Sequence, residues 1–83
     1  MIVKIRKSEY LVVARLLKEA RERSGLTQRD VAARLKVPQS FVSKYESAER
    51  RLDVLELRRL CRVLKISLPD LIRNIESSLG GSE

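Results

Sequence analysis

Residues 27–46 constrain the fold more than any other part of this 83-residue chain. The segment, TQRDVAARLKVPQSFVSKYE, has the pattern of two short helices joined by a tight turn. Thr27 with Asp30 three residues later predicts a helix start, because the hydroxyl can accept a first-turn amide and the carboxylate lies at the positive helix end. Three apolar residues then have the i, i+1, i+4 spacing of one buried helical stripe: Val31, Ala32 and Leu35.

The second half of the segment predicts a helix that is packed on one side and exposed on the other. This helix begins near Pro38 or Gln39. Val42 and Tyr45 form its narrow apolar stripe, and Phe41 lies beside them. The opposite face carries hydrogen-bonding side chains: Gln39, Ser40, Ser43 and Lys44. Because these four residues form two pairs spaced i, i+4, they lie on one exposed face.

The remainder of the chain indicates a single all-α domain with an aliphatic core. A chain of 83 residues can enclose one modest core. Only three residues are aromatic, and the low count of three glycines and two prolines favours helices over a loop-rich fold. Three further helices are expected after N-terminal capping residues: Ser8, Asp53 and Ser67. The predicted domain covers residues 8–79, preceded by an arm or short strand at 1–7 and followed by a flexible tail at 80–83.

Seven residues of the central segment form a known pattern: Gln28, Val31, Ala32, Leu35, Val37, Val42 and Tyr45. They resemble the helix-turn-helix of the lambda-repressor and Cro-like regulators, the XRE family, and the resemblance extends over about residues 11–72. Lys36 stands where the family usually has glycine, and Pro38 where a serine or threonine cap is usual. Ser47 and Ala48 replace the usual Asn-Gly. The resemblance implies a five-helix, lambda-repressor-like DNA-binding domain with the helix-turn-helix at its second and third helices.

This resemblance also assigns roles to individual residues. A recognition helix enters the major groove of double-stranded DNA and reads base edges with its first turns. We therefore expect base reading by the exposed face of the second helix of the motif: Gln39, Ser40, Ser43 and Lys44. Ser43 serves either a base or a phosphate, and Phe41 either contacts a base methyl group or packs. Gln28 resembles the phosphate-binding glutamine of the family, and Arg50 and Arg51 in the following loop are further candidate phosphate contacts.

The family also pairs an arginine with the glutamate that ends the recognition helix. Arg21 and Glu46 occupy those places here, so the resemblance implies an ion pair that fixes the recognition helix to the first helix. The alternative is two independently solvated side chains.

Charge is distributed unevenly along the chain. The 18 Lys and Arg residues exceed the 11 Asp and Glu residues by seven. Residues 53–83 balance five basic against five acidic side chains, so the entire excess lies in residues 1–52. A positive potential around the motif attracts phosphates and raises encounter rates. The alternative is a solvated basic surface without a partner.

The last predicted helix has more apolar residues than it needs to cover the core. In the family this helix often builds a two-fold interface, which sets two recognition helices about 34 Å apart. We expect a homodimer interface from four residues: Leu68, Ile72, Ile75 and Leu79. For residues 1–7 three uses stay open: pairing with another copy, DNA phosphate contacts through Lys4, Arg6 and Lys7, or a frayed end.

Together these features predict a sequence-specific, double-stranded DNA-binding transcriptional regulator, a repressor that acts as a homodimer on a palindromic operator. The alternative is an antitoxin or adaptor-type domain whose main ligand is another protein, such as a toxin or another regulator. In that case the surplus apolar residues of the last helix, with Val3 and Ile5, form its docking face. RNA binding is third, since no aromatic stacking platform is visible.

Several other functions are not expected. The chain has no histidine and one cysteine, Cys61, so we expect neither a metal site nor an intrachain disulfide. Cys61 falls in an apolar helical series and is expected in the core. No phosphate-binding glycine loop or activated nucleophile indicates an enzyme, and no cofactor or small-molecule ligand is evident. No apolar run is long enough to cross a membrane, so the chain is expected in the cytoplasm.

Overall fold

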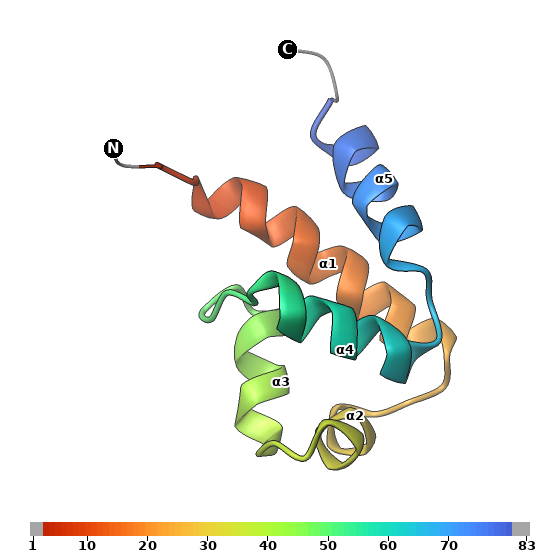
Figure 1. Ribbon diagram of the computed structural model, residues 1–83. Helices are drawn as coiled ribbons and strands as arrows, with labels where there is room; N and C mark the ends of the chain where they lie inside the picture. Colours follow the sequence, from red (N-terminus) through yellow and green to blue (C-terminus); the bar gives the residue numbers. More distant parts are fainter. Residues whose placement is uncertain (1–2, 81–83) are drawn as a thin grey trace.

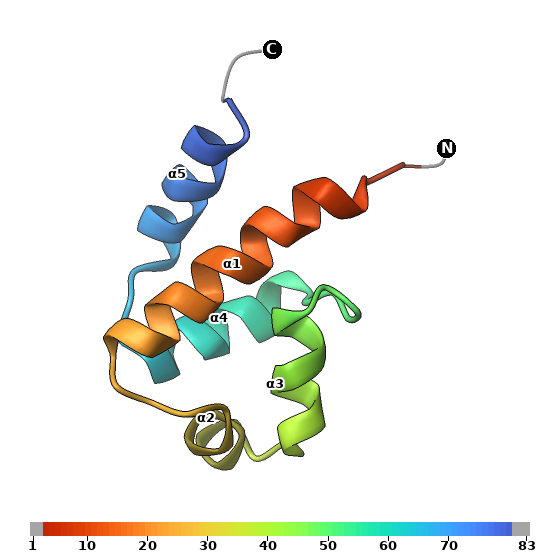
Figure 2. The same cartoon turned by 180° about the vertical axis from the view of Figure 1, so that it is seen from behind.

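The computed structural model describes residues 3–80, which form five α-helices and no strand. In chain order these are α1 (Lys7–Arg23), α2 (Gln28–Leu35), α3 (Gln39–Glu46), α4 (Val54–Leu64) and α5 (Leu68–Ser78). The two short helices α2 and α3 lie at one end of the molecule, whereas α1 and α5 diverge toward the chain termini at the other end (Figures 1 and 2). The predicted all-α, five-helix fold is confirmed. The expectations for residues 1–2 and 81–83 lie outside the described residues.

Three of the predicted helix starts are formed by local capping. The backbone amide three residues later lies 3.0 Å from Thr27 Oγ1, 2.7 Å from Asp53 Oδ1 and 3.2 Å from Ser67 Oγ. Each side-chain oxygen therefore accepts one of the first-turn amides that have no partner inside the helix. The Thr27 cap sets the start of α2, and with it the position of the whole helix-turn-helix.

The predicted start of the first helix at Ser8 is wrong. Helix α1 begins at Lys7, and Arg6 takes the capping position with an extended backbone. The Arg6 amide donates to Glu9 Oε1 at 3.0 Å. A carboxylate in the first turn thus satisfies the amide that precedes it, and no hydroxyl cap is required. Residues 3–6 have no helical or strand structure.

Four helices end in the same type of turn. The closing residue has a left-handed backbone, and the next amide returns to a carbonyl five residues earlier, which is the Schellman arrangement. The left-handed residues are Gly25 (φ 76°), Lys36 (φ 61°), Ala48 (φ 64°) and Lys65 (φ 59°). Only the first is glycine, although glycine adopts this conformation at no steric cost. The turn between α2 and α3 therefore keeps its geometry with Lys36 in place of the usual glycine.

The core is aliphatic except for one tyrosine and one cysteine. Its buried members are Leu17, Ala20, Val31, Ala32, Val42, Tyr45, Leu60, Cys61, Leu64 and Leu71. Burial raises the pKa of the Cys61 thiol, as expected for a core cysteine. Helix α2 packs on both α3 and α4, while α1 packs on α3 and α5. The core thus holds α3 from behind. None of the helices within residues 3–80 has the length and apolar character needed to span a bilayer.

Candidate nucleic-acid interface

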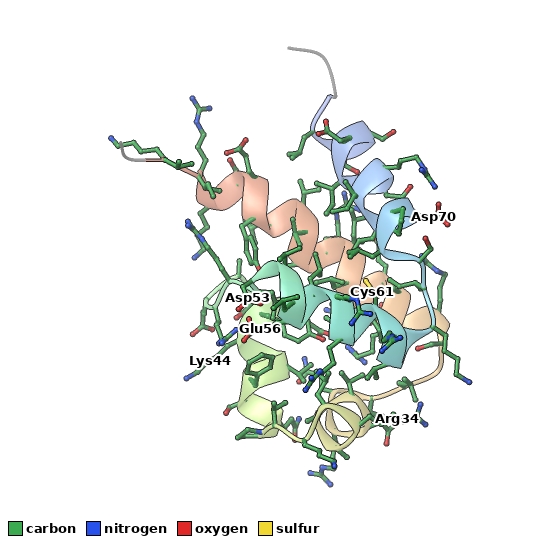
Figure 3. The ribbon with its side chains drawn as sticks, in the orientation of Figure 1. Arg34, Lys44, Asp53, Glu56, Cys61 and Asp70 are labelled. Atoms are coloured by element: carbon green, nitrogen blue, oxygen red, sulfur yellow. The ribbon has the colours of Figure 1, made fainter. Side chains whose placement is uncertain are left out.

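The outer face of α3 consists of the four side chains that the sequence predicted there: Gln39, Ser40, Ser43 and Lys44. All four are exposed. No ion pair within residues 3–80 involves Lys44. Figure 3 shows Lys44 on the side of α3 that faces away from Arg34 of α2. These donors and acceptors are therefore directed to solvent and are free to bind a ligand.

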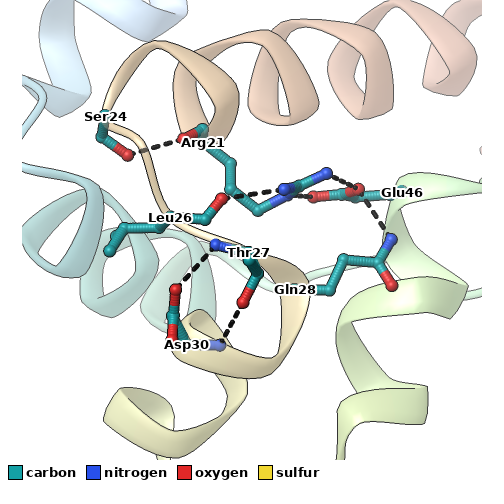
Figure 4. A network of polar contacts seen from close by, with 7 residues as sticks. All are labelled: Arg21, Ser24, Leu26, Thr27, Gln28, Asp30 and Glu46. Atoms are coloured by element: carbon teal, nitrogen blue, oxygen red, sulfur yellow. Dashed lines mark hydrogen bonds and ion pairs between the residues drawn. The ribbon is translucent and has the colours of Figure 1, made fainter.

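The carboxyl end of α3 is anchored by Arg21 and Glu46 (Figure 4). Arg21 Nε donates to Glu46 Oε2 at 2.7 Å, and Nη2 donates to Oε1 at 3.2 Å. The two side chains are 11% and 3% exposed, and Arg21 Nη1 also donates to the Leu26 carbonyl at 2.9 Å. The bond to Glu46 raises the pKa of Arg21. The predicted ion pair is present in this structure as a buried, bidentate contact that joins α1 to the end of α3.

Gln28 belongs to the same network. Its Nε2 donates to Glu46 Oε1 at 3.0 Å, so the side chain of the first residue of α2 is oriented by the last residue of α3. One amide hydrogen of Gln28 remains available, next to the amino end of a helix, where backbone amides favour an anion. A phosphate contact by Gln28 stays a prediction, and the structure adds that Glu46 positions the amide for it.

Arg50 has partners that the sequence did not indicate. Its Nη1 and Nη2 donate to the two carboxylate oxygens of Glu56 at 3.1 Å and 2.9 Å. Its guanidinium carbon lies 4.2 Å from the centre of the Phe41 ring, which in turn meets the Tyr45 ring edge to face at 6.0 Å. Phe41 is thus partly packed, one of the two expected alternatives. A phosphate contact by Arg50 stays a prediction. It requires the guanidinium to break its hydrogen bonds to Glu56, or to bind the phosphate and Glu56 at the same time.

The loop after α3 is fixed at two more points that were not foreseen. Arg51 Nη2 donates to the Ile5 carbonyl at 3.2 Å, and the Leu52 amide donates to the Tyr10 hydroxyl at 2.7 Å. Arg51 remains exposed, so its charge faces solvent beside the arm. These contacts join residues that are 46 and 42 positions apart in the chain, and no short-range sequence pattern indicates them.

The apolar residues of α5 divide into two groups. Leu68 and Ile75 pack against the core, whereas Ile72 and Leu79 are each 44% exposed. Leu11 on α1 is 46% exposed, and α1 is the helix on which α5 packs. Helix α5 therefore exposes apolar surface, as the sequence predicted, but only Ile72 and Leu79 of the four expected interface residues contribute to it.

Comparisons with known proteins agree with this architecture. A family model described as helix-turn-helix matches residues 17–71. A solved structure of an XRE-family like protein from Pseudomonas syringae pv. tomato str. DC3000 is 46% identical and aligns with a TM-score of 0.79, covering 86% of this chain and 87% of that one. A mutant of the restriction-modification controller protein C.Esp1396I is 21% identical with a TM-score of 0.78, covering 90% and 95%, which shows likeness of fold alone. No curated protein matches the chain.

The fold and the exposed, anchored α3 define a helix-turn-helix protein. The match of the family model and the identity to the Pseudomonas protein place it further: the chain belongs to the XRE family of helix-turn-helix DNA-binding regulators. The family that the sequence pattern indicated is confirmed.

Proposed function

We propose that this protein is a sequence-specific, double-stranded DNA-binding repressor that acts as a homodimer on a palindromic operator. The observation that carries the proposal is that α3 is held in the fold while its outer face is open. Val42 and Tyr45 are buried in the core and the buried pair of Arg21 and Glu46 fixes the carboxyl end of the helix, whereas the outer face presents exposed polar side chains. A rigid helix with free donors and acceptors meets the geometric requirement for reading base edges.

Base reading is assigned to the outer face of α3. Gln39 is the first residue of the helix, so its amide can make a bidentate contact to adenine, while Lys44 can donate to N7 and O6 of guanine. Ser40 and Ser43 lie between them and can donate to or accept from a base edge or a phosphate. Each good side-chain to base contact contributes about 1–3 kcal/mol of discrimination.

Phosphate contacts are assigned to residues on either side of α3. Gln28 lies at the amino end of α2, and Arg50 and Arg51 lie in the loop after α3. Such contacts fix the register of a protein on DNA without reading sequence. The net charge of +7 supports this part of the proposal, since each phosphate contact releases counterions from the duplex.

The experiment is selection of bound duplexes from a random DNA pool, followed by affinity measurements with two variants. Lys44→Ala should lower the preference at one base position by about 1–3 kcal/mol, because one base contact is lost. Gln28→Ala should weaken binding to every sequence alike, because a phosphate contact carries no sequence information. Lys18→Ala, on the exposed surface of α1, is the matched control for a lost charge and should leave sequence preference unchanged.

The base-reading assignment fails if both variants lose affinity equally on all sequences. The DNA-binding proposal as a whole fails if the selected pool shows no enrichment, or if affinity does not depend on salt concentration.

A further inference from the structure

An apolar groove lies where α2, α3 and α4 meet, and none of the residues assigned to DNA contacts lines it, although Arg50 binds Glu56 and covers Phe41, which do. Its volume is about 270 Å³. An apolar cavity of about 150 Å³ can hold a benzene ring, so the groove has room for a large apolar side chain. Its apolar lining comes from Leu35, Val37, Phe41, Leu52, Leu55 and Leu60. Leu55 is 72% exposed at the rim, next to Val54 at 66%, and these are large apolar side chains left in solvent.

One end of the groove is basic. Arg59 lines it, and Arg62 follows one turn later on α4. Both arginines are exposed, and neither forms an ion pair within residues 3–80. Residues 53–83 are neutral in sum, but three of their five basic side chains lie on α4: Arg58, Arg59 and Arg62.

The acidic side chains at the other end are already engaged. Glu56 binds Arg50 through both carboxylate oxygens, and Asp53 caps α4 by accepting the Glu56 amide. These carboxylates therefore do not neutralise the positive charge of the arginines at the other end of the groove. The groove presents an apolar floor, an exposed leucine and uncompensated positive charge.

We propose that this groove docks an acidic amphipathic helix of a partner protein. Apolar residues spaced i, i+3 and i+7 on such a helix fit a hydrophobic groove, and its carboxylates face the arginines. A second copy of this chain is disfavoured as the occupant. If two copies paired through α4, Arg58, Arg59 and Arg62 would face the same residues of the other copy. If instead the arm of a second copy entered the groove, it would bring Lys4, Arg6 and Lys7 to the arginines. Both arrangements place like charges together.

None of the four side chains that form the outer face of α3 lines the groove. Phe41, which does line it, follows Ser40 by one residue and therefore lies about 100° further around the helix. A partner in the groove and DNA on the outer face of α3 can therefore be bound together, and the partner would touch Val37 in the turn of the motif.

The experiment is a backbone NMR titration of the full chain with a synthetic helical peptide that has leucine on one face and glutamate on the other. We expect saturable shifts at Val37, Leu55 and Arg59. Arg59→Glu should weaken the peptide about tenfold by reversing one attractive contact. Lys18→Glu makes the same change of charge on α1 and should leave the affinity unchanged. Leu55→Asp tests the apolar contact separately.

Measurements with DNA separate this proposal from the proposed function. Arg59→Glu should keep DNA sequence preference, and Lys44→Ala should keep peptide affinity. The docking proposal is overturned if no shifts occur, if they are confined to Gln39, Ser40, Ser43 and Lys44, if a peptide with lysine in place of glutamate binds equally, or if light scattering shows that the groove residues join two copies of the chain. None of these results bears on DNA binding by α3.

Discussion

At the scale of single residues, backbone conformation limits the helix ends. Ala48 closes α3 with φ 64°, where an L-residue has steric strain of about 1–2 kcal/mol that glycine does not have. Its amide and that of Glu49 return to the carbonyls of Tyr45 and Lys44 at 3.3 Å and 2.8 Å, so this turn terminates the helix. The strain is tolerated because the two hydrogen bonds satisfy carbonyls that would otherwise lack partners.

Ala48→Gly should therefore stabilise the protein by about 0.5–1 kcal/mol, the relief of strain less the greater backbone freedom of glycine in the unfolded chain. Urea unfolding measures the change. Ala33→Gly is the matched control, since Ala33 is an exposed residue inside α2, and it should destabilise by about 1 kcal/mol. Loss of stability in Ala48→Gly would contradict the left-handed assignment.

The buried ion pair is the second feature at this scale. Glu46 is 3% exposed and depends on Arg21 for its principal partner, so removal of the arginine leaves a charge in the interior. Arg21→Ala should destabilise the protein by about 3–5 kcal/mol and lower DNA affinity, because α3 loses its anchor. Chemical denaturation and a DNA titration measure the two effects.

The control for Arg21→Ala is Arg15→Ala. Arg15 pairs with Glu19 at 3.3 Å on the surface of α1, with side chains 53% and 45% exposed, and such pairs contribute about 0.5 kcal/mol or less. Equal losses of stability in the two variants would show that the pair between α1 and α3 has no special role.

At the scale of elements, the starts of α2 and α4 depend on ionised carboxylates. Hydrogen bonds from Thr27 lower the pKa of Asp30 below its ordinary value of 3.8. The bond from Arg50, together with the Asp53 amide, lowers the pKa of Glu56 below its ordinary value of 4.5. Both groups therefore bind protons more readily in the unfolded chain than in the folded one. Their stabilising effect is complete above their ordinary pKa values and is lost as the pH falls through the lowered ones.

We expect stability to fall on acidification below about pH 4.5, measured as the urea midpoint at a series of pH values. Glu56→Gln should have lower stability at neutral pH and a shallower fall in acid, because one of the two groups no longer titrates. Stability that rises on acidification would mean that other groups dominate the pH dependence.

At the scale of the whole molecule, the exposed apolar residues of α5 bear on assembly. If the protein is a dimer through this face, Ile72→Asp with Leu79→Asp should convert it to a monomer, because each aspartate places a charge in an apolar contact. Light scattering measures the mass. The DNA affinity should fall together with the mass, because a monomer can no longer bind two half-sites at once.

Val54→Asp is the matched control for this pair, because Val54 is 66% exposed and is the first residue of α4, whereas the other end of α4 leads into α5. Its mass should equal that of the native protein. A native protein that stays monomeric at high concentration, or an Ile72 and Leu79 variant that stays dimeric, would rule out the α5 interface.

The sequence alone determined the features that depend on residues within one helical turn. Thr27, Asp53 and Ser67 cap helices because the oxygen and the amide it accepts are three residues apart. The polar outer face of α3 followed from spacing in the same way, and the family followed from the resemblance of the residues of the motif. The start at Ser8 was wrong because the Glu9 carboxylate, equally local, satisfies the Arg6 amide instead.

Only the tertiary structure decided how distant residues combine. Arg50 meets Glu56 and Phe41, Tyr10 meets Leu52, and Arg59 lines a groove with Leu35, because helix packing brings together residues that are far apart in the chain. A residue pattern encodes which side of each helix is apolar, and packing of the apolar sides then fixes which polar groups become neighbours.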